Sequence, residues 1–137
     1  MVCEDFCFFN MHRAFHWPPL YKRIHKIHHQ HKHPISIVAQ YAHPVETIGN
    51  LLCMFIGPAF LQHRIHHYTM ILWYCYRGAE SVEGHCGYEF SWSMFRALPW
   101  SAGASYHNFH HLENVGNYSS FFTFWDTMFD TNKVWFN

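Results

Sequence analysis

Residues 47–61, TIGNLLCMFIGPAFL, decide the fold, because the whole run lacks a charged side chain. At 1.5 Å per residue a helix of this length reaches roughly 22 Å, short of the roughly 30 Å hydrocarbon core of a bilayer. Gly57-Pro58 interrupts the run, and a second apolar run, YTMILWYCY, follows at 68–76. Neither run is expected to cross a membrane alone. Together they predict a short helical hairpin dipping into a membrane, or two core helices of a soluble protein, and the nearby aromatic residues favour the membrane interface.

Outward from this hairpin, the pattern predicts an all-α, membrane-associated domain covering residues 1–137, because strand signals are weak throughout. Pro18 ends the first helix and Pro19 opens the second. The expected segments are a helix at 5–16, a helix at 19–31, a helix or turn at 78–90, a loop at 91–100 and a terminal helix from Tyr118 to Phe136, with Phe121, Phe122, Trp125 and Phe129 on one face.

Composition excludes some functions and favours others. The 137 residues fit one domain, and nine Lys+Arg balance nine Asp+Glu, so no basic excess exists to bind nucleic acid. The outliers are 15 His and a heavy aromatic load of 14 Phe, 8 Tyr and 6 Trp. At such density, histidine is typical of metal ligation and proton handling.

The five cysteines and the N-terminus bear on the compartment. Cys3, Cys7, Cys53, Cys75 and Cys86 contain no C-x-x-C pair, and their odd number makes a poor disulfide framework. Cys53 and Cys75 lie in apolar runs and are expected to be buried thiols. This cysteine usage predicts a reducing, cytosol-facing site. No basic stretch precedes an apolar one at the N-terminus, so we expect no signal peptide.

Three histidine groups stand out on the expected helices. Positions i, i+3 and i+4 lie on one side of a helix, so each group is expected to aim its imidazoles at a single point. An H-x-x-H-H group should occur by chance roughly 0.2 times in such a chain, and it occurs twice. The groups are His12 with His16, then His25 with His28 and His29, then His107 with His110 and His111.

Eight clustered imidazoles exceed the needs of one ion. A tetrahedral zinc takes four ligands, and a catalytic zinc usually takes three and a water. We therefore predict a dimetal site, although imidazole suits Fe, Zn, Cu and Ni and does not identify the metal. Such a site beside apolar surface suggests O₂ chemistry on a lipid, because attack on an unactivated C–H bond needs an oxidant that no side chain supplies.

Further polar residues lie near the hairpin. His43 precedes it and His85 follows it, so both are additional candidate ligands. Glu89 could be a ligand or an acceptor for a ligand N–H group, and the two interpretations stay open. Accepting or structural roles are expected for Glu46, Glu83 and Asp126. Ordinary surface or core positions are expected for His31, His33, His63, His66 and His67.

Six motifs carry a family resemblance. They are HRAFH at 12–16, HKIHH at 25–29, AHPVE at 42–46, HCGYEF at 85–90, HNFHH at 107–111 and GNYSSFFTFWD at 116–126. In this order they resemble the fatty acid hydroxylase/sterol desaturase superfamily. Within it, YAHPVE at 41–46, HCGYEF and GNYS are most similar to the C4-methylsterol monooxygenases.

The resemblance implies an all-helical protein of the endoplasmic reticulum membrane, with two non-haem iron ions in a cytosol-facing site. It implies O₂-dependent oxidation of a sterol 4α-methyl group through alcohol and aldehyde to acid. Electrons would come from NAD(P)H through cytochrome b5 and its reductase. The three histidine boxes of the superfamily match His12, His16, His25, His28, His29, His107, His110 and His111, and its additional histidines match His43 and His85.

Family members are usually longer, with a membrane hairpin before the first histidine box, which begins here at residue 12. The chain is therefore expected to be a fragment or a reduced homologue. The alternatives within the superfamily are a C5-sterol desaturase and a fatty acid hydroxylase. Outside enzymes, the chain could be a structural subunit that joins other membrane subunits. A soluble zinc or copper protein would leave the apolar hairpin unexplained.

Overall fold

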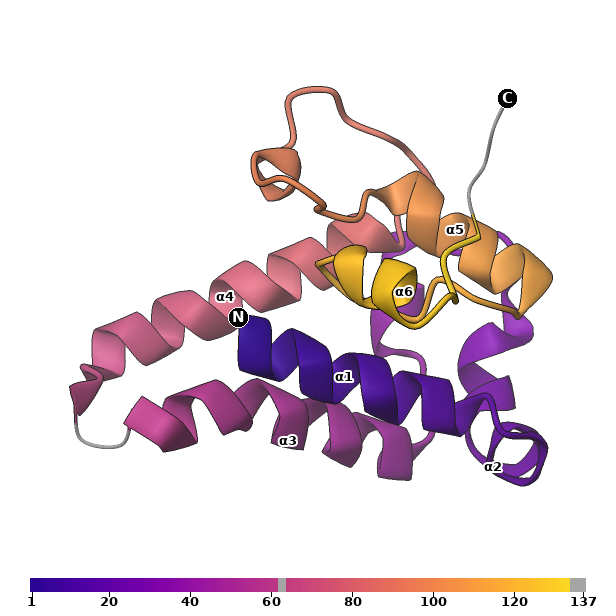
Figure 1. The fold of residues 1–137 in the computed structure, drawn as a ribbon, viewed down its shortest axis with the longest axis horizontal. Coiled ribbons are helices and arrows are strands. Elements are labelled where there is room, and N and C mark those ends of the chain that lie inside the picture. Colours follow the sequence, from indigo (N-terminus) through magenta and orange to yellow (C-terminus); the bar gives the residue numbers. More distant parts are fainter. Residues whose placement is uncertain (62–63, 134–137) are drawn as a thin grey trace.

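The computed structural model describes residues 1–61 and 64–133, which fold into helices joined by loops (Figure 1). Within these residues the β-type pairing is confined to an isolated bridge between Ser101 and Phe122, so the all-α prediction is confirmed. The elements are α1 (Val2–Phe15), α2 (Pro18–Arg23), the 3-10 helices η1 (His25–Gln30) and η2 (Ser36–Gln40), α3 (Pro44–Leu61), α4 (His67–Gly84), η4 (Met94–Arg96), α5 (Ala104–Glu113) and α6 (Phe124–Met128).

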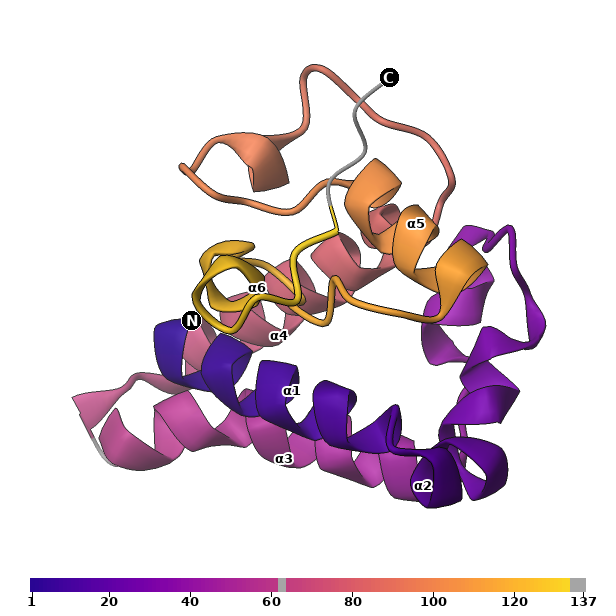
Figure 2. The same ribbon diagram turned by 45° about the vertical axis from the view of Figure 1, so that its right-hand side comes forward.

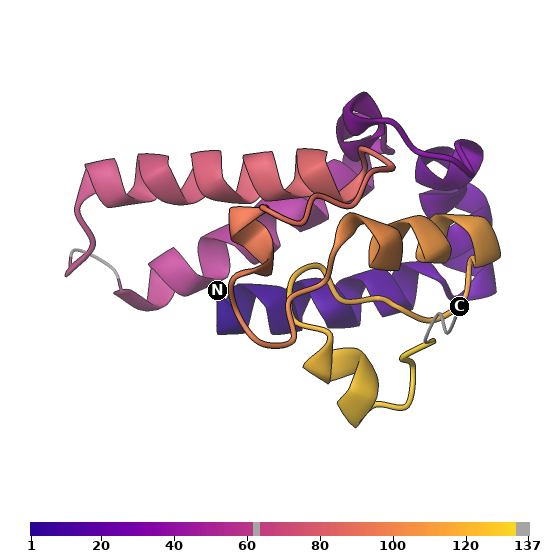
Figure 3. The ribbon, with the colours of Figure 1, turned by 90° about the horizontal axis from the view of Figure 1, so that it is seen from above.

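The apolar hairpin consists of α3 and α4, and α4 turns back toward the other helices (Figure 3). Among the described residues, α3 is the one helix long and apolar enough to cross a membrane by length and composition. The expectation that neither run suffices is therefore corrected for α3. The helix begins at Pro44, since proline suits a first turn, and it continues through Pro58. Its 18 residues span about 27 Å.

The outer face of α3 is left uncovered by the other described residues, 1–43 and 64–133. Leu52 is 65% exposed and Phe60 is 76% exposed. Of the residues in α3, Glu46 and Cys53 are buried. The expectation of a buried thiol is therefore confirmed for Cys53 and wrong for Cys75, which is exposed on α4. An apolar run indicates a helix, but it does not tell which side of the helix is covered.

Helix α1 lies along α3 (Figure 2). Gly49 allows this close approach, because a Cβ atom there would come within 2.6 Å of the Met11 Sδ atom. The carboxylate of Asp5 on α1 is fully buried and accepts the backbone N–H groups of Phe121 and Phe122 at 2.7 and 2.9 Å. One acidic side chain therefore fixes the C-terminal segment to the first helix.

The C-terminal segment is not the long helix that its aromatic spacing predicts. Helix is confined to Phe124–Met128, and the last part of the expected helix, 134–136, lies outside the described residues. The buried Asp126 carboxylate accepts the backbone N–H groups of Tyr118 and Ser119 at 2.8 and 2.7 Å. These N–H groups are thereby satisfied outside a helix, which removes the main reason for a helix to form there.

Candidate metal centre

Nine histidines gather in two clusters. The elements that carry them, α1, η1, α4 and α5, converge at the end of the molecule away from the α3–α4 connection (Figure 1). In each cluster, one ring nitrogen from every member lies within 4.8 Å of those of the others. Cluster 1 contains His12, His16, His25, His29 and His110. Cluster 2 contains His28, His85, His107 and His111. All but two of these residues are buried, and His16 and His107 are half-buried.

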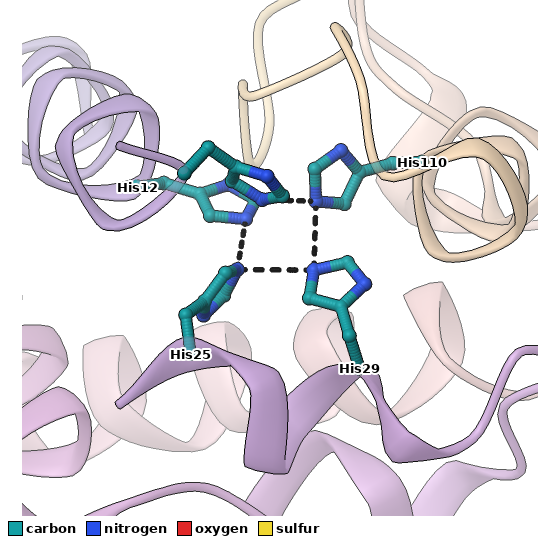
Figure 4. Close-up of side chains that lie close together, drawn as sticks. His12, His25, His29 and His110 are labelled. Atoms are coloured by element: carbon teal, nitrogen blue, oxygen red, sulfur yellow. Dashed lines mark hydrogen bonds between the residues drawn. The ribbon is translucent and has the colours of Figure 1, made fainter. Parts of the chain in front are cut away.

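Cluster 1 joins three separate stretches of the chain. Figure 4 shows rings from α1, η1 and α5 pointing toward a common centre. The Nε2 atom of His25 lies 3.1 Å from that of His12 and 3.0 Å from that of His29. The Nε2 atom of His110 lies 3.2 Å from that of His29 and 3.1 Å from that of His16.

Cluster 2 adds the C-terminal end of α4. The Nε2 atom of His85 lies 3.2 Å from that of His28 and 2.9 Å from that of His107. His107 and His111 approach each other at 3.2 Å. The two clusters adjoin, because the ring centroids of His29 and His111 are 4.6 Å apart.

The expectation that each sequence group aims at one point is wrong for the two H-x-x-H-H groups. In both, the i and i+4 histidines join one cluster and the i+3 histidine joins the other. On α5 the reason is angular: successive residues turn by about 100°, so His110 projects about 60° to one side of His107 and His111 about 40° to the other. One helix therefore supplies both clusters.

The second histidine group also departs from its predicted helix. A continuous helix over 19–31 was expected, but α2 ends at Arg23, and the backbone breaks at Ile24 before η1 begins. The break accompanies tertiary contacts that outweigh helix propensity. His28 bonds to the Tyr41 carbonyl oxygen, while His25 faces α1.

Backbone carbonyls fix the protonation of four rings. The Nδ1 atom of His12 lies 2.8 Å from the Tyr118 oxygen, and that of His28 lies 3.1 Å from the Tyr41 oxygen. The Nδ1 atom of His85 lies 2.7 Å from the Ser81 oxygen, and that of His110 lies 2.6 Å from the Gly116 oxygen. A carbonyl only accepts, so in each of these contacts Nδ1 carries the proton. In a neutral ring the Nε2 atom then carries a lone pair.

Lone pairs therefore converge inside both clusters. His28 and His85 both use Nδ1–H on carbonyls, yet their Nε2 atoms are 3.2 Å apart, so neither neutral ring can donate to the other. Such contacts are favourable when a cation lies between the nitrogens. Nitrogens bound at about 2.1 Å to one ion and at right angles to each other lie about 3.0 Å apart, close to the spacing found here. The donor set therefore fits metal ions.

Burial keeps the rings neutral. Desolvation is the largest cause that lowers the pKa of all nine imidazoles below the ordinary value. The pKa is lowered to about 4 for His16 and to about 3 for His85. Neutral imidazole is the form that binds metal, so the clusters are ready to ligate at neutral pH.

Both clusters border one cleft, which is partly open to solvent. Its wall includes His12 and His25 of cluster 1 and His28, His85 and His107 of cluster 2. Apolar side chains of α1, α3 and η4 line it as well, namely Phe8, Leu51, Met54 and Phe95. The cleft can therefore hold an apolar molecule against both clusters.

A model of the fatty acid hydroxylase family matches residues 1–131. The chain belongs to the fatty acid hydroxylase family. It is 45% identical over 134 residues to methylsterol monooxygenase erg25B of Aspergillus fumigatus, covering 95% of this chain and 45% of that protein. It is 41% identical over 133 residues to methylsterol monooxygenase 1 of Danio rerio, covering 96% and 45%.

The chain is also similar to a protein named for a different reaction. Very-long-chain aldehyde decarbonylase GL1-11 of Oryza sativa subsp. japonica is 39% identical over 139 residues, covering 99% of this chain and 52% of that protein. The chain spans about half the length of these curated relatives. No solved structure matches it.

Within this member of the fatty acid hydroxylase family, some candidate residues lie apart from the clusters. His43 belongs to neither, because its Nδ1 accepts the Val45 N–H group at the start of α3. Glu89 likewise belongs to neither, since it accepts the Ser105 N–H group and pairs with Arg96. His31, His33, His66 and His67 also lie outside both clusters, and His63 lies outside the described residues.

Glu46 supports cluster 1 from outside. Its Oε1 atom lies 2.9 Å from the His25 Nδ1 atom, an ion-pair contact with a ring of the cluster. Glu83 accepts a hydrogen bond from the Ser93 hydroxyl, and Asp126 bonds the backbone of the C-terminal segment.

Sequence reasoning missed a buried ion network in the wall of the cleft. Arg77 donates to Glu4 at 2.9 and 3.1 Å, to Glu80 at 2.7 Å and to Ser120 at 2.8 Å. The sequence feature that could have indicated this network is Arg77, a charged residue directly after the second apolar run. The network joins α1, α4 and the C-terminal segment, and so holds together elements that carry histidines.

Proposed function

We propose that this chain forms the metal-binding core of a lipid C–H oxygenase that oxidises a 4-methyl group of a sterol. One observation carries the proposal: unprotonated ring nitrogens converge in two adjoining clusters along the wall of a partly apolar cleft. The methylsterol monooxygenase relatives support the choice of reaction and substrate. The motifs that resemble the superfamily support a non-haem diiron site.

The proposed ligands are the nine histidines of the two clusters, one ion to each cluster, and His43 is not among them. Bound iron would supply, with O₂ as co-substrate, the oxidising power that attack on an unactivated C–H bond requires. Carbonyl and carboxylate contacts orient the rings from outside, and burial keeps the rings neutral, with one ring nitrogen free to bind metal.

The side chains of the cleft would position the substrate. Phe8, Leu51 and Met54 offer apolar surface for the sterol rings, and the neighbouring histidines of both clusters border the same space. Apolar walls also displace water from the reacting carbon. The methyl group would pass through alcohol and aldehyde to acid, with electrons from NAD(P)H through cytochrome b5 and its reductase.

The exposed apolar face of α3 supports membrane association. The histidine clusters lie on elements that converge at the end of the molecule away from the α3–α4 connection (Figure 1). With the hairpin in the bilayer, the clusters would lie near the membrane surface, in reach of a lipid substrate. We propose the endoplasmic reticulum membrane, with the clusters facing the cytosol, as the location.

The test combines metal analysis with turnover of the purified protein in lipid nanodiscs. We expect about two iron ions per chain, one for each histidine cluster, and O₂-dependent oxidation of a 4-methylsterol with reductant, cytochrome b5 and its reductase present. His33→Ala is the matched control, because His33 is exposed and outside both clusters. Iron-loaded protein that oxidises another lipid and no sterol would refute the substrate. Absence of bound metal would refute the site.

A further inference from the structure

Two side chains of α3 that line the cleft each have a buried oxygen atom without a hydrogen-bond donor among the described residues. The atoms are Glu46 Oε2 and Asn50 Oδ1. Glu46 is 4% exposed, so water does not readily satisfy its free oxygen. A buried acceptor without a partner is costly, which makes a ligand with a donor group the natural complement.

The two acceptors share one face of α3, and Glu46 lies beside cluster 1. Residues 46 and 50 are separated by four positions, so they are neighbours on the same side of α3. The other carboxylate oxygen of Glu46 lies 2.9 Å from the His25 Nδ1 atom. Glu46 therefore spans from a proposed metal ligand to the cleft, which places its free oxygen near the reacting end of a bound substrate.

We propose that Glu46 and Asn50 bind a substrate hydroxyl group located on the carbon next to the reacting one. This inference rests on the proposed function and names the feature of the substrate that the site selects. A 4-methylsterol carries its hydroxyl on C3, directly bonded to the carbon that bears the reacting methyl group. Binding that hydroxyl beside cluster 1 would hold the methyl group toward the histidines.

The third unpartnered oxygen in the cleft wall, Glu4 Oε2, is in the wrong place for this role. Glu4 precedes His12 by eight residues, about 12 Å along α1. A hydroxyl bound there could not be attached to the carbon next to one reacting at the clusters. Glu4 is also already paired with Arg77.

The same geometry predicts discrimination between lipids. The unpartnered amide oxygen of Asn50 only accepts hydrogen bonds, so it favours an alcohol over a ketone or a hydrocarbon at that position. A site built to bind a hydroxyl rejects an analogue without one, since the buried acceptors remain unpaired. Unsubstituted acyl chains lack this donor next to any reacting carbon.

The experiment measures equilibrium binding of radiolabelled ligands to the iron-loaded protein in nanodiscs under argon, so that turnover does not interfere. The probes are a 4,4-dimethyl-3β-hydroxysterol, its 3-deoxy analogue and its 3-ketone. We expect the wild type to bind the hydroxysterol about 10- to 100-fold more tightly than the deoxy analogue, as expected for a hydrogen bond to a buried polar group.

The variants test the acceptors separately. Asn50→Leu keeps a similar volume without an acceptor, and we expect it to reduce the hydroxyl preference. Glu46→Gln keeps an oxygen for His25 and can turn an amide N–H toward the cleft, so we expect the ketone to gain relative to the alcohol. Asn10→Leu is the matched control, because Asn10 is exposed and does not line the cleft. Helix content and bound iron are measured on every variant.

The outcomes separate this inference from the proposed function. Equal binding of the hydroxysterol and the deoxy analogue to wild type would overturn the hydroxyl site and leave a sterol oxygenase possible. A hydroxyl preference that survives unchanged in folded, iron-loaded Asn50→Leu and Glu46→Gln would also overturn it. Failure of wild type to bind any of the sterols would overturn both proposals.

Discussion

Acid should unfold the metal-free protein in a narrow range near pH 6. The nine clustered histidines have folded pKa values below the ordinary value, to about 4 for His16 and about 3 for His85. In the unfolded chain each returns to about 6.5. The unfolded state therefore binds more protons below pH 6.5. The stability that these groups confer is fully present above about pH 6.5 and is lost as the pH falls toward the folded values.

The size of the effect follows from the number of buried rings. At pH 5.5, one unit below the unfolded pKa, each ring that is neutral only in the folded state lowers stability by about 1.4 kcal/mol. Nine such rings together amount to roughly 13 kcal/mol, comparable to the roughly 5–15 kcal/mol that stabilises a whole domain. Loss of tertiary structure is therefore expected between about pH 6.5 and 5.5.

The assay is near-ultraviolet circular dichroism of chelator-treated protein in micelles, titrated from pH 8 to pH 4. Iron-loaded protein is the control, and its transition should move to lower pH, since metal and protons compete for the same nitrogens. A tertiary signal in the metal-free protein that stays unchanged down to pH 5 would refute the claim that these rings are buried and neutral.

Two further predictions concern side chains with contrasting roles. His110 and His111 are adjacent in the chain but belong to different clusters. Each substitution to Ala should therefore weaken the binding of one iron ion and leave the binding of the other unchanged. The loss of affinity should exceed the roughly 10- to 100-fold loss that follows removal of a supporting residue. Anaerobic iron titration measures both affinities, and the double variant should bind both ions more weakly. Loss of both ions from either single variant would contradict the assignment. Asp5→Ala removes the acceptor of two buried N–H groups and should cost about 3–5 kcal/mol, with Asp5→Asn costing less. Urea unfolding measures this, and a change below about 1 kcal/mol would count against the role of Asp5.

Local patterns predicted the elements better than the connections. The apolar runs correctly indicated α3 and α4, and the proline pair correctly separated α1 from α2. The aromatic spacing after Tyr118 predicted a long helix, but most of the described residues of that segment are irregular. That pattern could not show that Asp5, far away in the sequence, would satisfy the backbone N–H groups there.

The sequence predicted which histidines form the site, but it did not predict how they are arranged in space. Spacing identified eight of the nine clustered histidines, and the position of His85 after the apolar run added the ninth. His43 had similar grounds, yet its ring bonds to the backbone of its own turn. The unpartnered oxygen of Asn50 has no sequence signal, since only the packing of α3 buries it in the wall of the cleft.

The sequence by itself determined the helical fold class, the apolar hairpin and an excess of imidazoles at helical spacing, because periodicity and residue chemistry are local properties. Only the tertiary structure decided how those imidazoles divide into two clusters, since that division depends on how α1, η1, α4 and α5 cross one another. It also decided which polar atoms were left without a partner, because burial and hydrogen bonding are set by neighbours distant in the chain.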